Sequence, residues 1–98
     1  MPKTRVVDFR REPYDVYIGR ASPRHGLARS KWHNPFRVGR DGTRLEVIAK
    51  YEAYLRGRPD LMAALHELRG KRLGCWCHPR PCHGDVLARL ADELPRTT

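Results

Sequence analysis

The segment from Leu73 to Asp85 constrains the fold most, because it joins a short apolar run to an amphipathic pattern through a loop rich in thiols and imidazoles. The loop holds all three cysteines of the chain and two of its histidines, namely Cys75, Cys77, His78, Cys82 and His83. The apolar run predicts a strand over 71–76, and the helical spacing of leucines after it predicts a helix. Strand-to-helix loops are where α/β proteins place their functional sites.

The length of the chain limits it to one domain. A sequence of 98 residues builds a single core of modest size, so every motif is expected to belong to one unit spanning 1–98. We expect the core to extend over about 16–94, with 1–12 as an edge strand or an arm and 95–98 as a tail.

Two β-favouring runs, 6–9 and 15–19, come before a long aperiodic loop over 20–43. A helix is then expected from the cap Thr43 to the stop signal Gly57, and a second helix from the cap Asp60 to Gly70. The last helix is expected to open at Asp85.

The resulting order β-β-loop-α-α-β-α predicts an α/β fold. Its sheet is expected to be short, mixed or partly parallel, with about three strands, the 15–19 strand the more central, and about three helices. If 16–18 and 73–75 run parallel, Gly19 and Cys75 lie at the same edge, where ligands bind in open α/β sheets.

Charge favours an anionic ligand. Lys and Arg number 20 against 11 Asp and Glu, which gives a net charge of +9. This excess is typical of proteins that bind nucleic acid or phosphate, although an arginine-rich surface can also serve solubility alone. The sequence has no apolar run that could span a bilayer and no signal-peptide pattern, so we expect a cytoplasmic protein with reduced thiols and no membrane partner.

The chain resembles a family of small domains of unknown function, number 4326, encoded by bacteria and their phages. The resemblance runs from about Val16 to Leu94 and rests on the motifs Val16-Tyr17-Ile18-Gly19-Arg20, Trp32-His33-Asn34-Pro35-Phe36, Gly74-Cys75-Trp76-Cys77 and Cys82-His83-Gly84-Asp85. It implies a compact α/β domain with a shared site, and it supplies no reaction.

The thiols and imidazoles allow several interpretations. A metal site for zinc or iron would use Cys75, Cys77, Cys82 and His83, with His25 or His33 able to complete it. The spacing differs from that of a standard zinc finger, because Cys75 and Cys77 would point to opposite faces of a continued strand. In the purely structural alternative, Cys75 and Trp76 belong to the core and the other thiols have no role.

The start of the last helix favours negative charge, because its amides are unpaired and the helix dipole is positive there. Cys82 and His83 are the candidate reactive side chains at this position, and Asp85 is interpreted as a cap. The residues expected to bind the ligand or its phosphate are Gly19, Arg20, Asn34, Arg80 and Gly84. Asn34 could instead shape a turn with Pro35.

Basic and aromatic side chains alternate in the 20–43 loop, as in proteins that bind single strands or flipped bases. The expected nucleic-acid contacts are Arg24, Arg29, Lys31, Trp32, Arg37 and Arg40. The alternative is that Trp32 and Phe36 fill the core while the arginines are solvated, and for Phe36 we favour the core.

Two functions follow. The first is a domain that binds a nucleotide or nucleic acid at a basic, Cys/His-containing site, with group-transfer or hydrolytic chemistry as an extension. The second is a non-enzymatic module, stapled by a metal or not, that binds nucleic acid or an acidic host protein. No Walker loop, paired carboxylates or Gly-x-Gly-x-x-Gly fingerprint is present, so the sequence does not decide whether the protein is an enzyme.

Overall fold

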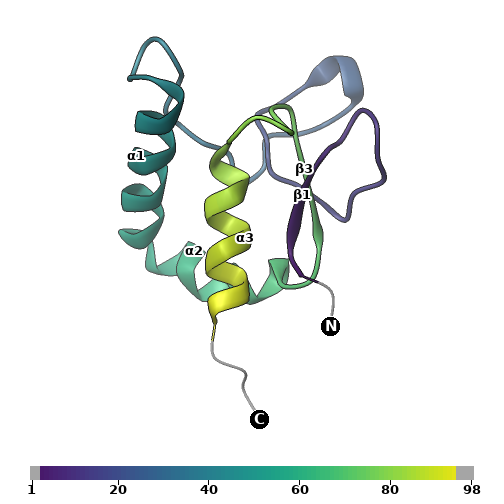
Figure 1. The fold of residues 1–98 in the computed structure, drawn as a ribbon. Coiled ribbons are helices and arrows are strands. Elements are labelled where there is room, and N and C mark those ends of the chain that lie inside the picture. The colour runs from purple at the N-terminus through teal and green to yellow at the C-terminus, as the bar shows by residue number, and fades with distance from the viewer. Residues whose placement is uncertain (1–2, 95–98) are drawn as a thin grey trace.

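A computed structural model describes residues 3–94, and the expected tail at 95–98 lies outside the described residues. Figure 1 shows the arrangement of its elements. In chain order they are β1 (Arg5–Asp8), β2 (Val16–Tyr17), η1 (Pro23–His25), α1 (Arg44–Arg56), α2 (Pro59–Ala64), η2 (Leu65–Leu68), β3 (Arg72–Cys75) and α3 (His83–Glu93). The expected small single α/β domain, with three strands and three α-helices, is confirmed.

The sheet has the order β1-β3-β2, and both strand pairs are parallel. The expectation that the 15–19 strand is the more central was wrong, because β3 lies between the other two strands. Gly74 in β3 lies opposite Val7 on one side and Tyr17 on the other. Residues 5–8 form an edge strand of the sheet.

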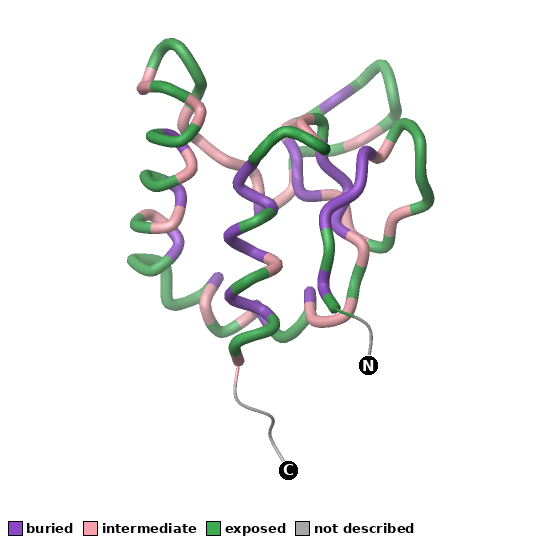
Figure 2. Tube along the Cα trace, in the orientation of Figure 1, coloured by how far each residue is buried: buried purple, intermediate pink, exposed green. Residues whose placement is uncertain are grey.

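The two faces of the sheet pack against different parts of the chain. On one face α3 packs against β1 and β3, and α1 in turn packs against α3. On the other face Gly74 lies under Phe9 and Tyr14, so close that an added Cβ would be 3.0 Å from each. Figure 2 shows that buried and exposed residues alternate along α1 and α3, so each helix has one buried side.

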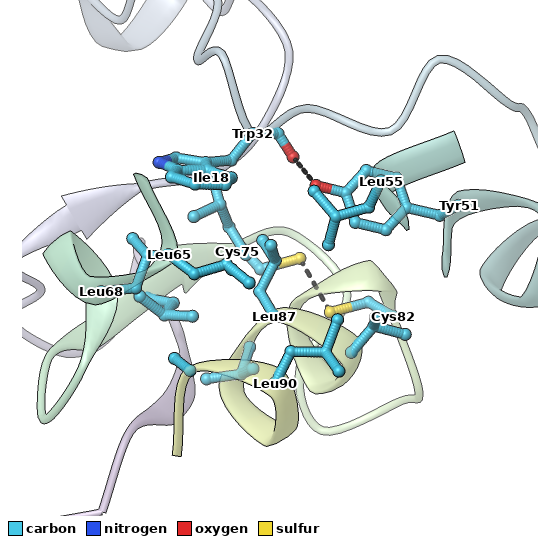
Figure 3. Packing of buried hydrophobic residues seen from close by; sticks show 14 of the residues in the cluster. Ile18, Trp32, Tyr51, Leu55, Leu65, Leu68, Cys75, Cys82, Leu87 and Leu90 are labelled. Carbon is cyan, nitrogen blue, oxygen red and sulfur yellow. Dashed lines mark hydrogen bonds between the residues drawn. The ribbon is translucent and has the colours of Figure 1, made fainter. Parts of the chain in front are cut away.

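The core lies between the helices and the first face. Figure 3 shows its centre, where Leu87 of α3 meets residues from the sheet, α1 and η2. The fully buried leucines and isoleucine of this core are Ile18, Leu55, Leu65, Leu68, Leu73 and Leu87. Trp32 joins them at 2 % exposure, and its carbonyl accepts a 2.8 Å hydrogen bond from the Tyr51 hydroxyl.

Helix starts were predicted with mixed success. Thr43 caps α1, as expected, and it also forms a capping box with Glu46. Asp60 does not cap α2, which begins at Pro59 after Arg58, because proline's fixed φ suits the first helical position. α3 begins two residues before Asp85, with Cys82 as N-cap, and the Asp85 carboxylate accepts from the Cys82 amide at 3.1 Å.

Among residues 3–94, no helix combines the length and apolar character that a bilayer crossing requires.

Candidate functional site

The carboxyl ends of β2 and β3 lie at one edge of the sheet, as predicted. The Ile18 amide donates to the Gly74 carbonyl at 3.0 Å, which continues the pairing past β2. Gly19 and Cys75 then line the same cavity, whose volume is about 510 Å³. This size is within the range of small-molecule sites.

Four segments wall this cavity, which we call the edge cavity. They are the loop after β2, the 34–38 part of the long loop, the first turns of α1, and the cysteine loop that leads into α3. Val47 and Ile48 of α1 supply an apolar wall. Phe36 also lines the cavity and is half-buried, so the expectation that it is a core residue was wrong.

Three arginines line the edge cavity: Arg20, Arg37 and Arg44. The Arg20 guanidinium donates to the carbonyls of Asn34 and Phe36, each at 3.0 Å. Burial, with Arg37 and Arg40 nearby, lowers its pKa from the ordinary value. Among residues 3–94, none of the three cavity arginines forms an ion pair with a carboxylate.

Asn34 lines the cavity but is engaged in its own loop. Its Oδ1 accepts from the Phe36 amide at 2.9 Å, and its Nδ2 donates to the Val47 carbonyl at 3.4 Å. The first contact is the side-chain turn that Asn before Pro favours. The amide therefore fixes the loop against α1, and the turn interpretation of Asn34 accounts for its observed contacts.

The cysteine loop brings two thiols together. Cys75 and Cys82 are both buried, with their Sγ atoms 3.2 Å apart (Figure 3). The neighbouring Cys77 thiol lowers the pKa of Cys75, but the Cys82 thiol and burial outweigh it and raise that pKa to about 11. The Cys75 thiol and burial raise the pKa of Cys77 as well. Cys75 and Cys77 are therefore protonated at neutral pH.

His83 is held by the backbone of the neighbouring strand end. It is 8 % exposed, and its Nε2 donates to the Ile18 carbonyl at 2.7 Å, since a carbonyl can only accept. Burial lowers the pKa of His83 to about 4, with Arg20 nearby acting in the same direction. The ring is therefore neutral at pH 7 and Nδ1 keeps its lone pair.

The expected anion site at the amides of α3 is not open. The Gly84 amide donates to the Cys82 sulfur at 3.3 Å, and the Cys82 amide is bound by Asp85. Gly84 is buried, and a Cβ there would lie 2.8 Å from both Ile18 and Val6. Its lack of a side chain serves close packing, so the expectation that a ligand approaches there is corrected.

The glycine at position 19 is also required by close packing. A Cβ at this position would lie 2.5 Å from the Tyr17 hydroxyl, which donates to the Arg20 carbonyl at 2.6 Å. The same hydroxyl accepts from the indole Nε1 of Trp76 at 2.9 Å. The Tyr17 hydroxyl thus connects the loop that carries Arg20 to the loop that carries Trp76, and both residues line the edge cavity.

A second hollow of about 430 Å³ adjoins the edge cavity and shares Arg20 and Arg37 with it. Arg29, His33 and Arg40 also line it. Three of the expected nucleic-acid contacts, Arg29, Arg37 and Arg40, therefore lie around this hollow.

Other predicted site residues lie elsewhere. Arg80 and Gly84 do not line the edge cavity, and Arg24 and Lys31 line neither hollow. Lys31 forms an ion pair with Glu67 at 2.9 Å. Trp32 is in the core, so the expectation that its ring stacks on a base was wrong. The ring is packed among other buried side chains and is not exposed to a ligand.

Some lining residues were not in the predicted set. Val47 and Ile48 belong to the apolar pattern of α1, which by itself indicates a core face, and Arg44 is the first residue of that helix. Trp76 is 36 % exposed and lines the cavity. Because Trp76 is the last residue of the predicted strand, its position in the sequence could have indicated that it lies at the site.

Of the predicted metal ligands, the structure groups three. One donor atom from each of Cys75, Cys82 and His83 lies within 4.8 Å of the other two. Cys77 lines the cavity beside them without belonging to this group, and His25 and His33 do not belong to it either.

Comparison with known proteins gives one family and two viral relatives. The family described as "Domain of unknown function (DUF4326)" matches residues 3–93. An uncharacterized protein, R718, of Acanthamoeba polyphaga mimivirus is 40 % identical over 86 residues, covering 78 % of this chain and 65 % of the relative. The chain thus spans slightly less than two thirds of that relative. An uncharacterized 12.4 kDa protein from the nrdA-td intergenic region of Enterobacteria phage T4 is 35 % identical over 95 residues, covering 92 % of this chain and 79 % of the relative. No solved structure matches the chain.

Proposed function

This chain belongs to the DUF4326 family, and for it we propose a nucleotide-binding function, in which the edge cavity receives the phosphate and the base of a nucleotide. The observation that carries the proposal is the set of three cavity arginines without a carboxylate partner in residues 3–94. Guanidinium groups pair with phosphate through two parallel hydrogen bonds, and this pairing strengthens when water is partly excluded.

The remaining walls suit a base. Phe36 and Trp76 offer aromatic surface, and Val47 and Ile48 offer apolar contact. No Asp or Glu from the described part of the chain lines the cavity, so it holds no carboxylate that could act as a base in hydrolysis. We therefore limit the proposal to binding.

The second hollow supports a nucleotide that is part of a strand. Its arginines, Arg29 and Arg40, extend the positive surface beyond Arg37. A base in the edge cavity would place neighbouring phosphates along this surface. A free nucleotide and a nucleotide in a strand share the same phosphate chemistry, and affinity for the two kinds of ligand distinguishes them.

The test is a calorimetric titration of the protein with the four ribonucleoside monophosphates, inorganic phosphate and decathymidylate. We expect Arg37→Gln and Arg44→Gln each to weaken binding about 10-fold, the usual loss for a hydrogen bond to a charged group. Arg56→Gln is the matched control, because Arg56 is at the opposite end of α1 from Arg44 and lines neither hollow.

Equal losses in Arg44→Gln and Arg56→Gln would show general charge attraction and contradict binding in the cavity. A strand that binds at least 10-fold more tightly than any mononucleotide, with a steep salt dependence, would identify the ligand as nucleic acid. The absence of any binding by the wild-type protein would contradict the proposal altogether.

A further inference from the structure

Two buried thiols and one buried imidazole line the edge cavity and come from two elements. Cys75 ends β3, whereas Cys82 caps α3 and His83 begins it. From this geometry we infer that Cys75, Cys82 and His83 bind one divalent metal ion that prefers sulfur and nitrogen, with Zn²⁺ as the best fit. This inference is independent of the proposed nucleotide function.

The donor distances suit a tetrahedral ion. Zinc–sulfur bonds of about 2.3 Å place neighbouring donors of a tetrahedron about 3.7 Å apart. The Sγ atoms of Cys75 and Cys82 are 3.2 Å apart, and one ring nitrogen of His83 lies within 4.8 Å of both. Binding therefore requires the two sulfurs to separate by roughly half an ångström, which a side-chain rotation can supply.

The imidazole is presented in the form that a metal needs. The Ile18 carbonyl accepts the Nε2 proton of His83, which fixes the ring and leaves the lone pair on Nδ1. Histidine ligands usually donate their second N–H to a carbonyl or carboxylate in this way.

The surroundings favour the thiolate form once a cation is present. Cys82 is at the N-cap of α3, where the helix dipole stabilises negative charge, and its sulfur already accepts from the Gly84 amide. On binding, each thiol loses its proton to solvent and donates a sulfur electron pair to the ion. Two protons are therefore released for each ion bound, and no oxidation takes place.

The set has three protein ligands, which leaves the fourth tetrahedral position toward the cavity that all three residues line. Three ligands and an open position are typical of zinc sites that contact a small molecule. Cys77 lines the cavity but lies outside the close group, so we do not assign it as a ligand.

The experiment uses the full chain, purified under reducing conditions without chelator. Native mass spectrometry should show one Zn²⁺ per chain, and Co²⁺ added to the metal-free protein should give the absorption of a tetrahedral ion with two thiolates. We expect Cys75→Ser and Cys82→Ser to weaken Zn²⁺ binding at least 100-fold. Cys77→Ser and His78→Ala are the matched controls and should stay within threefold of the wild type.

The wild-type measurement does not depend on the folding of any variant. Absence of Zn²⁺ and of Co²⁺ uptake at equimolar concentration would overturn the inference. Loss of the ion in Cys77→Ser would overturn the assignment of the three ligands, as would full retention in Cys82→Ser. Arg44→Gln should retain the ion, so the metal site and the nucleotide proposal fail separately.

Discussion

At Gly84, the first turn of α3 packs against two buried side chains, Val6 of β1 and Ile18 directly after β2. An added Cβ would lie 2.8 Å from the Cδ1 of Ile18 and 2.8 Å from the Cγ2 of Val6. Both neighbours are buried, so neither can move without repacking the core. The same contact holds His83 near the Ile18 carbonyl, which links packing at one residue to the geometry of the site.

We expect Gly84→Ala to lower the free energy of unfolding by about 1–3 kcal/mol, the usual cost of overpacking a core. Gly57→Ala is the control, because a Cβ at Gly57 meets its nearest atoms at 3.5 Å and φ there is −85°. Urea denaturation measures both variants. A Gly84→Ala protein as stable as Gly57→Ala would show that the helix is free to shift.

The kinds of side chain in the site could be predicted from sequence, but their exposure could not. The predicted set included Arg20 and Cys82, because charge and thiol chemistry are visible in the residue type. Trp32 and Phe36 look equivalent in sequence, yet Trp32 is buried and Phe36 lines the cavity. Their exposure depends on how the long loop packs against α1, which a local pattern does not contain.

Among the elements, α1 and α3 both begin with a capping box. Thr43 and Cys82 each accept from an amide of the first turn, while Glu46 and Asp85 accept from the cap's own amide. In α3 the cap is a thiol, so the residue that begins the helix is also the residue that faces Cys75.

Replacing the cap of α1 tests this account. We expect Thr43→Ala to lower the free energy of unfolding by about 1 kcal/mol, because the Glu46 amide loses its acceptor. Glu46→Gln keeps an oxygen for the Thr43 amide and should cost only a few tenths of a kcal/mol. If urea denaturation finds equal losses in the two variants, the capping box is not the cause.

The start of β2 is attached to β3 by a charged pair. Asp15 accepts from the amide, Nε and Nη2 of Arg72 at 2.8, 3.1 and 3.0 Å. The side-chain hydrogen bonds from Arg72 lower the pKa of Asp15 from 3.8 to about 2. Because the folded-state pKa is depressed, the stability from this pair is fully present above about pH 5 and is lost as pH falls through 3.8 toward 2.

We expect wild-type protein and Asp15→Asn to differ in stability at pH 5 and to converge as pH approaches 2. Urea midpoints at pH 5, 4, 3 and 2 measure this difference, and the other carboxylates act equally in both proteins. A difference that stays constant between pH 5 and 2 would contradict the assigned role of Asp15.

Element order was predictable and strand order was not. Helical spacing and stop residues located α1, because periodicity is local. The relative position of β2 and β3 depends on which strands pair, and the two-residue strand Val16–Tyr17 carries too little pattern to show it. Gly74 was the available signal, since close packing against Phe9 and Tyr14 marks a covered, central strand.

At the level of the whole molecule, parallel pairing decides where the chemistry gathers. It brings the ends of β2 and β3 to one edge, and α1 closes that edge with Arg44. Arg20 and Arg37 of the long loop and Arg44 of α1 thus surround one cavity together with the cysteine loop.

The most direct test of ligand binding in the edge cavity is a ¹⁵N–¹H correlation spectrum recorded while a ribonucleoside monophosphate is added. The chain has two tryptophans, so the indole signals provide an internal comparison. Trp76 lines the cavity and Trp32 is buried in the core. The account predicts saturable shifts of the Trp76 indole and the Gly19 amide, with the Trp32 indole unmoved. Shifts confined to the exposed loop around Arg24, or no shifts with any of the four monophosphates, would contradict it.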